Sequence, residues 1–163
     1  MRQIADRERR LWDISPTIGP GFPVFPGDTP FSQRWTCVLN DSCPVNVSEI
    51  VMSPHTGSHT DAPLHYDAAG AAIADLPLDA YLGPCRVVHA IDAAALIEPG
   101  HFAGQLHATP PRILVRTCRA SVFERWNPDF TAIAPASIDL LHDNGVHLIG
   151  IDTPSLDPAD SKS

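Results

Sequence analysis

The sequence predicts a mixed α/β domain with short strands, few helices and long loops. First, residues 86–91, 113–117 and 146–152 are apolar and rich in β-branched side chains, which is typical of buried strands. Second, residues 136–144 carry apolar side chains at helical spacing and end at Asn144-Gly145, a pair that commonly stops a helix. Third, 17 prolines among 163 residues predict many turns.

Weaker patterns predict the remaining elements. Residues 11–15 are expected to begin the globular part as a strand, and the Pro- and Gly-rich residues 16–30 to form an ordered loop. Residues 45–52 alternate in polarity as a strand does. Residues 121–126 are expected to make a helical turn that ends before Pro128.

Length and charge bound the class of protein. The hydrophobic content of 44% in 163 residues fits one domain, which we place at residues 11–163 after a polar, loosely ordered arm at residues 1–10. The net charge of -8 argues against a nucleic acid or an anionic membrane as partner. Because the charged start lacks the apolar stretch of a signal peptide, and no run approaches the length of a membrane helix, we expect a cytoplasmic protein.

The four cysteines do not form a Cys-x-x-Cys pair. Cys85 and Cys118 stand in apolar segments and are expected to be small buried side chains. Cys37 and Cys43 flank the turn-like residues 40–42. A disulfide between them is an open alternative, but no other feature of the sequence supports it, and the cytoplasm is reducing.

The most informative segment is His55-Thr56-Gly57-Ser58-His59-Thr60-Asp61-Ala62-Pro63-Leu64-His65. Its proline and glycine disfavour a helix, so a strand or a strand-edge loop is expected. In an extended chain the side chains alternate in facing, and His59, Asp61 and His65 would therefore lie on one face. His55 would join them if the chain bends at Gly57.

Imidazole and carboxylate groups that converge in this way suit a divalent metal such as zinc. An isolated histidine is usually a surface residue, whereas several such groups in one short segment favour metal binding. Three protein ligands leave a coordination position open for water, which is the arrangement of catalytic sites. The segment therefore predicts a catalytic metal centre.

Two residues outside this segment are candidates with alternative roles. Phe25, in the loop of residues 16–30, either packs against the loop or forms a pocket wall. Asp152 follows a predicted strand and either caps the turn there or orients a metal-binding histidine. The histidines without clustered partners are expected to be surface or structural residues; they are His89, His101, His107, His142 and His147.

The chain resembles the cyclase-like metal-dependent hydrolases, in particular the bacterial kynurenine formamidase (arylformamidase) group. The segment described above has the pattern His-x-Gly-x-His-x-Asp-x-Pro-x-His of that family. Further matching segments are LWDISP at residues 11–16, PVFPGDTP at residues 23–30, LGPCRV at residues 82–87 and GIDTPSLDP at residues 150–158. The resemblance thus extends over nearly the whole chain.

The resemblance implies a role for each matching residue. His55, His59 and Asp61 would bind zinc, with Asp61 bridging two ions, and His65 would be the catalytic general acid and base. Phe25 stands at an aromatic position that contacts substrate. The implied reaction is hydrolysis of N-formyl-L-kynurenine to L-kynurenine and formate, in tryptophan degradation through the kynurenine pathway. The implied fold is a barrel-like mixed sheet with few short helices, in a homodimer.

The chain ends at Ser163, before the positions at which relatives carry the His and Glu of the second metal site. We therefore expect a domain whose C-terminal part is truncated. Two alternatives stay open: a related metal-dependent amidase or cyclase with another substrate, and a catalytically dead truncated copy.

Overall fold

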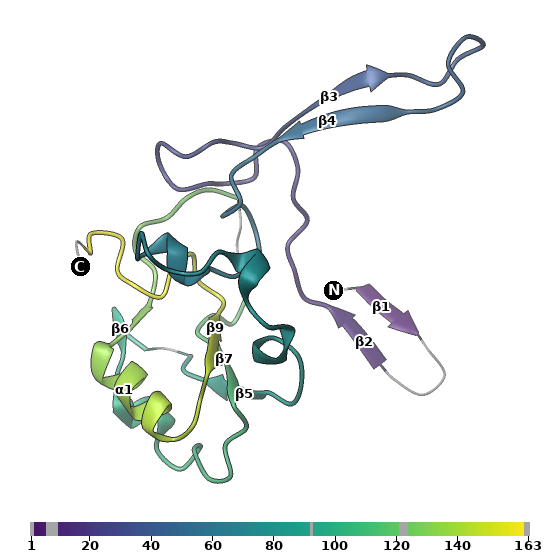
Figure 1. The fold of residues 1–163 in the computed structure, drawn as a ribbon. Helices are drawn as coiled ribbons and strands as arrows, with labels where there is room; N and C mark the ends of the chain where they lie inside the picture. Colours follow the sequence, from purple (N-terminus) through teal and green to yellow (C-terminus); the bar gives the residue numbers. More distant parts are fainter. Residues whose placement is uncertain (1, 6–9, 92, 121–123, 162–163) are drawn as a thin grey trace. The chain divides into compact units, whose positions relative to one another are not determined.

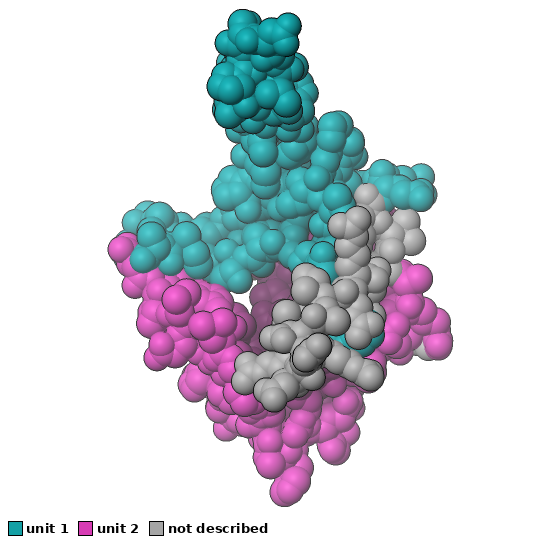
Figure 2. Space-filling model, turned by 90° about the vertical axis from the view of Figure 1, so that its right-hand side faces the viewer, with its two compact units in different colours: residues 1–74, 122–126 teal, residues 75–121, 127–163 magenta. Residues whose placement is uncertain are grey.

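The computed structural model describes residues 2–5, 10–91, 93–120 and 124–161. They group into two compact units, coloured separately in Figure 2. Unit 1 comprises residues 1–74 and 122–126, and unit 2 comprises residues 75–121 and 127–163. The boundary expected between an arm and a domain at residue 11 stays a prediction.

Unit 2 is built on a parallel sheet whose strand order is β5-β7-β9 (Figure 1). Its strands are β5 (Arg86–His89), β7 (Arg112–Arg116) and β9 (Leu148–Ile151), so the three predicted apolar strands are confirmed. A second parallel pair joins β6 (Leu96–Ile97) to β8 (Ala132–Ile133), and the sequence did not predict either strand. The short 3-10 helices of the chain are η1 (Pro63–His65), η2 (Ile73–Asp75), η3 (Leu78–Ala80) and η4 (Pro99–Phe102).

The hydrophobic core lies in unit 2, which contains every buried apolar residue among those described. Its largest fully buried side chains are Phe102, Ile97, Ile113, Leu141 and Val88. Gly150 of β9 pairs with Leu114 of β7, and a Cβ at Gly150 would come within 2.6 Å of Leu114 Cδ2. A side chain at position 150 would therefore force the end of the Leu114 side chain to move.

The predicted helix is confirmed as α1 (Pro135–Asp143). Proline is tolerated at its start, where the missing N–H has no helical partner, and the chain leaves the helix through Gly145 at a φ of 78°. Ser137 has a role that the sequence did not reveal. Its buried hydroxyl donates to the carbonyl oxygen of Ile97 at 2.7 Å, which ties the helix to β6.

Unit 1 contains two antiparallel pairs of strands. β1 (Arg2–Ala5) pairs with β2 (Arg10–Asp13), so part of the expected loose arm is a strand. β3 (Ser32–Cys37) and β4 (Val47–Val51) form a long hairpin, and β4 confirms the strand predicted at residues 45–52 (Figure 1). The loop predicted at residues 16–30 is also confirmed.

The cysteines differ from expectation. Cys37 and Cys43 form a disulfide across the end of the β3–β4 hairpin, where unpaired thiols were favoured. Cys85 is exposed, so its predicted burial is wrong, and Cys118 is partly buried. An apolar sequence neighbourhood does not decide the burial of one side chain, because the facing of each residue depends on its tertiary contacts.

Two further expectations differ from the structure. The described strands form four separate small sheets and no closed barrel, although the mixed α/β class with few helices is confirmed. Of the helical turn expected at residues 121–126, residues 121–123 lie outside the described part and residues 124–126 are not helical. Within the described ranges, no helix has the length and apolar character needed to cross a membrane.

Candidate metal centre

The histidine-rich segment is a loop that follows β4, in agreement with the predicted strand-edge loop. It turns sharply at Gly57, whose φ of 74° is readily adopted only by glycine. A Cβ at Gly57 would lie 2.7 Å from Ile18 Cδ1, so the backbone packs directly on that side chain. The bend brings His55 back toward His59 and Asp61, as the sequence predicted.

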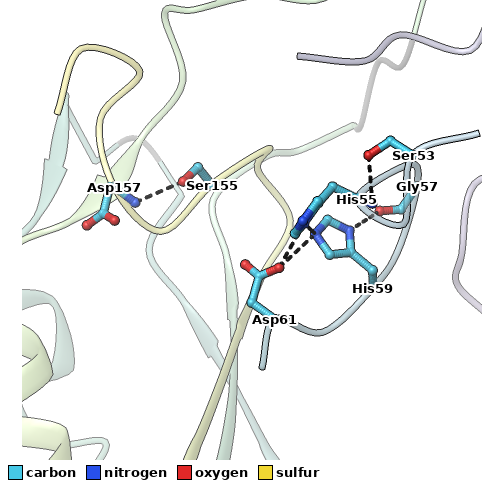
Figure 3. A network of polar contacts seen from close by, with 7 residues as sticks. All are labelled: Ser53, His55, Gly57, His59, Asp61, Ser155 and Asp157. Atoms are coloured by element: carbon cyan, nitrogen blue, oxygen red, sulfur yellow. Dashed lines mark hydrogen bonds and ion pairs between the residues drawn. The ribbon is translucent and has the colours of Figure 1, made fainter. Parts of the chain in front are cut away.

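Three side-chain atoms converge at the bend (Figure 3). His55 Nδ1 lies 2.9 Å from Asp61 Oδ1 and 3.2 Å from His59 Nε2. The third side of the triangle, from His59 Nε2 to Asp61 Oδ1, is 3.4 Å. The three side chains are 26–34% exposed, so solvent reaches the triangle.

The size of this triangle fits a tetrahedral zinc ion. Zinc–nitrogen and zinc–oxygen bonds of about 2.0–2.2 Å place neighbouring ligand atoms of a tetrahedron about 3.4 Å apart. The observed separations of 2.9, 3.2 and 3.4 Å therefore approach the dimensions of one triangular face. His55, His59 and Asp61 are thus the residues that could hold a metal.

A backbone contact orients one of these histidines. His59 Nδ1–H donates to the carbonyl oxygen of Gly57 at 2.8 Å. A carbonyl oxygen can only accept a hydrogen bond, so the proton of the neutral ring is on Nδ1. The lone pair of Nε2 is then directed at the triangle. Such a contact on the far ring nitrogen is typical of metal-binding histidines.

A second contact anchors His55 and was missed by the sequence argument. The backbone N–H of His55 donates to Ser53 Oγ at 3.2 Å. The hydroxyl of Ser53, which is buried, donates in turn to the carboxylate of Asp28. This bond and one from the Thr29 N–H, with a smaller effect of His55, lower the pKa of Asp28 from 3.8. In the sequence, Asp28 stood out only as part of residues 23–30, one of the segments that match the family.

His65 lies beside the triangle without being part of it. It ends the 3-10 helix η1, and its ring centroid is 4.3 Å from that of His55. The turn after it is tightly closed, because Leu64 N–H donates to Ala71 O at 3.1 Å and a Cβ at Gly70 would come within 2.5 Å of the Pro63 backbone. A rigid turn therefore holds the His65 imidazole next to the potential ligands.

Phe25 is half-exposed and packs edge-on against Trp126, with a centroid distance of 5.2 Å and an interplanar angle of 78°. Both residues belong to unit 1. The contact of Trp126 with Phe25 was not predicted, because no local pattern links Trp126 to a loop a hundred residues earlier. Packing within the loop and a pocket wall remain compatible roles for Phe25.

Asp152 joins two strand ends, a role that neither of its two interpretations describes. Its carboxylate accepts from the Thr117 hydroxyl at 2.7 Å and from the backbone N–H groups of Thr117 and Cys118. It therefore ties the end of β7 to the end of β9 in unit 2. Among the other histidines, His142 is 80% exposed and His101 belongs to a capping arrangement with Glu98.

The fold resembles that of solved structures described as metal-dependent hydrolases. One similar solved structure is described as a potential metal-dependent hydrolase with cyclase activity; its TM-score is 0.73 at 25% identity, over 92% of this chain and 71% of that one. Another is described as a predicted metal-dependent hydrolase from Bacillus stearothermophilus; it also has a TM-score of 0.73 at 25% identity, over 93% of this chain and 72% of that one.

The chain belongs to the Cyclase family, described as "Putative cyclase", which matches residues 12–158. Its relatives include proteins named kynurenine formamidase. Those of Bordetella pertussis and Bordetella bronchiseptica are each 56% identical over 155 residues, which are 95% of this chain and 74% of the relative. That of Bordetella petrii is 54% identical over the same shares. The resemblance found in the sequence is thereby confirmed.

Proposed function

We propose that this chain hydrolyses N-formyl-L-kynurenine to L-kynurenine and formate, a step of tryptophan degradation through the kynurenine pathway. The triangle of His55, His59 and Asp61 is the single observation that carries the proposal, because its dimensions suit a catalytic metal. The kynurenine formamidases at 54–56% identity support the choice of substrate. The name of the relatives supports a hydrolase that acts on an amide, and the titles of the similar structures support a metal-dependent hydrolase.

We propose zinc as the metal, since two imidazole nitrogens and a carboxylate oxygen are common zinc ligands. In the wider family we expect two ions per subunit, with Asp61 as the bridging ligand. When bound, zinc would acidify a water molecule at neutral pH and, as a Lewis acid, polarise the formyl carbonyl group. His55, His59 and Asp61 provide the fixed geometry for this chemistry.

In this proposal His65 transfers the proton. Its imidazole stands beside the ligand triangle, at 4.3 Å from the His55 ring, and the closed turn after it limits its motion. Because an anilide nitrogen is a poor leaving group until it is protonated, His65 would deliver a proton to the aryl amine. General acid–base assistance of this kind is typically worth about 10²–10⁴-fold in rate.

Phe25 would contact the aryl ring of the substrate. Its half-exposed ring is held edge-on by Trp126, which fixes its orientation and leaves part of its surface free for a planar group.

The subunit would act as a homodimer through the β3–β4 hairpin. A two-stranded hairpin is marginally stable alone, and its exposed apolar residues include Trp35 (58%) and Ile50 (55%), which share one face. Further exposed apolar residues on the hairpin are Val38, Leu39, Val45, Val47 and Val51.

A cytoplasmic location stays a prediction, and reducing conditions there would open the Cys37–Cys43 disulfide.

The experiment is a formate-release assay with N-formyl-L-kynurenine, before and after treatment with a chelator. We expect turnover that the chelator abolishes and added zinc restores. His65→Ala should lower kcat by about 10²–10⁴-fold with the metal retained. His142→Ala, which removes an imidazole that is 80% exposed, is the matched control.

Two outcomes would contradict the proposal. Absence of formate from a folded, zinc-loaded protein would reject the substrate. Loss of metal from His65→Ala would show that His65 is a ligand.

A further inference from the structure

Unit 1 has an open hollow of about 250 Å³ close in sequence to the loop that carries Phe25. It is lined by Thr17, Gly19, Pro20, Gly21, Phe22 and Glu124. The loop is shaped by a turn in which the Phe22 N–H donates to the Gly19 carbonyl oxygen at 3.0 Å. A Cβ added at Gly19 or Gly21 would meet nothing within 4 Å, so the space before these glycines is open.

The loop that lines this hollow touches the metal-binding segment. Ile18 stands between two lining residues, and its side chain packs on Gly57. Gly57 in turn accepts the hydrogen bond that orients His59. A molecule bound with its reactive group at the triangle would therefore have this loop as a neighbour.

The same loop is joined to residues 124–126 at two points. Glu124 completes the lining of the hollow, and Trp126 packs edge-on against Phe25 at 5.2 Å. An aromatic ring that contacts Phe25 and a carboxylate that lines the hollow thus come from one short segment. This combination suits a ligand that carries an aryl ring and, beyond it, a cation.

Charge selects which end of the substrate fits. Among the described residues that line the hollow, Glu124 alone is ionisable, and none is a Lys or Arg that could receive a carboxylate. In N-formyl-L-kynurenine the amino-acid arm is attached to the ring carbon next to the one that carries the formamide, and its ammonium group is the one cation of the substrate. A hollow of about 250 Å³ is below the usual volume of a whole ligand site, so it suits one end of the molecule.

We infer that this hollow binds the α-ammonium group of the substrate and that Glu124 is the residue that selects it. The inference rests on the proposed function and adds the group by which the enzyme distinguishes an amino-acid formamide from a simple aryl formamide. Glu124 acts in binding and has no part in the proton transfer assigned to His65.

The test compares two substrates in the zinc-loaded protein of 163 residues. One is N-formyl-L-kynurenine, and the other is its deamino analogue, in which hydrogen replaces the α-ammonium group. We expect Glu124→Gln to raise KM for the first about tenfold, with kcat little changed, and to leave KM for the analogue unchanged. Glu49→Gln, which removes a carboxylate paired with Arg34 on the hairpin, should alter neither value.

Equal effects of Glu124→Gln on both substrates, or no effect on either, would overturn the inference. Calorimetric binding of L-kynurenine separates this failure from failure of the proposed function, since it needs no turnover. We expect Glu124→Gln to weaken L-kynurenine binding about tenfold. If the wild-type protein binds L-kynurenine no better than its deamino analogue, the inference is wrong whether or not formate is released.

Discussion

Replacing Gly57 with alanine tests how the bend builds the metal centre. At a φ of 74°, an L residue costs about 1–2 kcal/mol relative to the right-handed region. The new Cβ would also stand 2.7 Å from Ile18 Cδ1 and 2.8 Å from Cγ1, so Ile18 must move, and overpacking typically costs about 1–3 kcal/mol. We therefore expect Gly57→Ala to destabilise the protein by about 2–5 kcal/mol in total.

A matched control separates the two costs. Gly104 has the same φ of 74°, and a Cβ there meets nothing within 4 Å, so Gly104→Ala should cost only the backbone part. Urea unfolding of each variant gives the free energies. Ile18→Ala removes both clashing carbons. Added to Gly57→Ala, it should therefore recover most of the free energy by which Gly57→Ala exceeds Gly104→Ala in destabilisation. Equal destabilisation of the two glycine variants, without recovery by Ile18→Ala, would refute the reasoning.

Three further perturbations test other parts of the account. Ser53→Ala removes the acceptor of the His55 backbone N–H, a hydrogen bond worth about 1 kcal/mol. Zinc affinity, measured by chelator competition, should therefore fall about fivefold. Unchanged affinity would show that this bond does not position His55. The lowered pKa of Asp28 stabilises the fold above the unfolded value of 3.8, and this contribution is lost as the pH falls through the folded pKa. Asp28→Asn should therefore flatten the acid limb of a denaturation curve below about pH 4, and an unchanged limb would contradict the assignment. Trp35→Glu places a charge on the apolar hairpin face and should shift the sedimenting species from dimer to monomer; a wild-type monomer would refute the proposed interface.

The ligand triangle was predictable from the sequence because its geometry is local. His55, His59 and Asp61 lie within seven positions, and one glycine bend brings them together. Strands β5, β7 and β9 and helix α1 were predictable for a similar reason. Each of these strands contains a run of apolar residues, and the helix has both its periodicity and its Asn144-Gly145 stop within one segment.

Contacts between distant segments were not predictable from local patterns. Nothing near Trp126 indicates that it packs on Phe25, and nothing near Ser53 indicates its bond to Asp28. The Cys37–Cys43 disulfide depends on how the hairpin closes, and the exposure of Cys85 depends on which side of the chain faces the core. Each of these features is set by tertiary packing, which residue type alone does not encode.

The central claim is that His55, His59 and Asp61 bind the metal on which hydrolysis depends. Elemental analysis of the purified protein tests it most directly, with zinc per chain compared among wild type, His59→Ala and the control His142→Ala. We predict bound zinc in wild type and in the control. A folded His59→Ala should lose both the bound zinc and the formate-releasing activity. Full zinc content in His59→Ala would contradict the account.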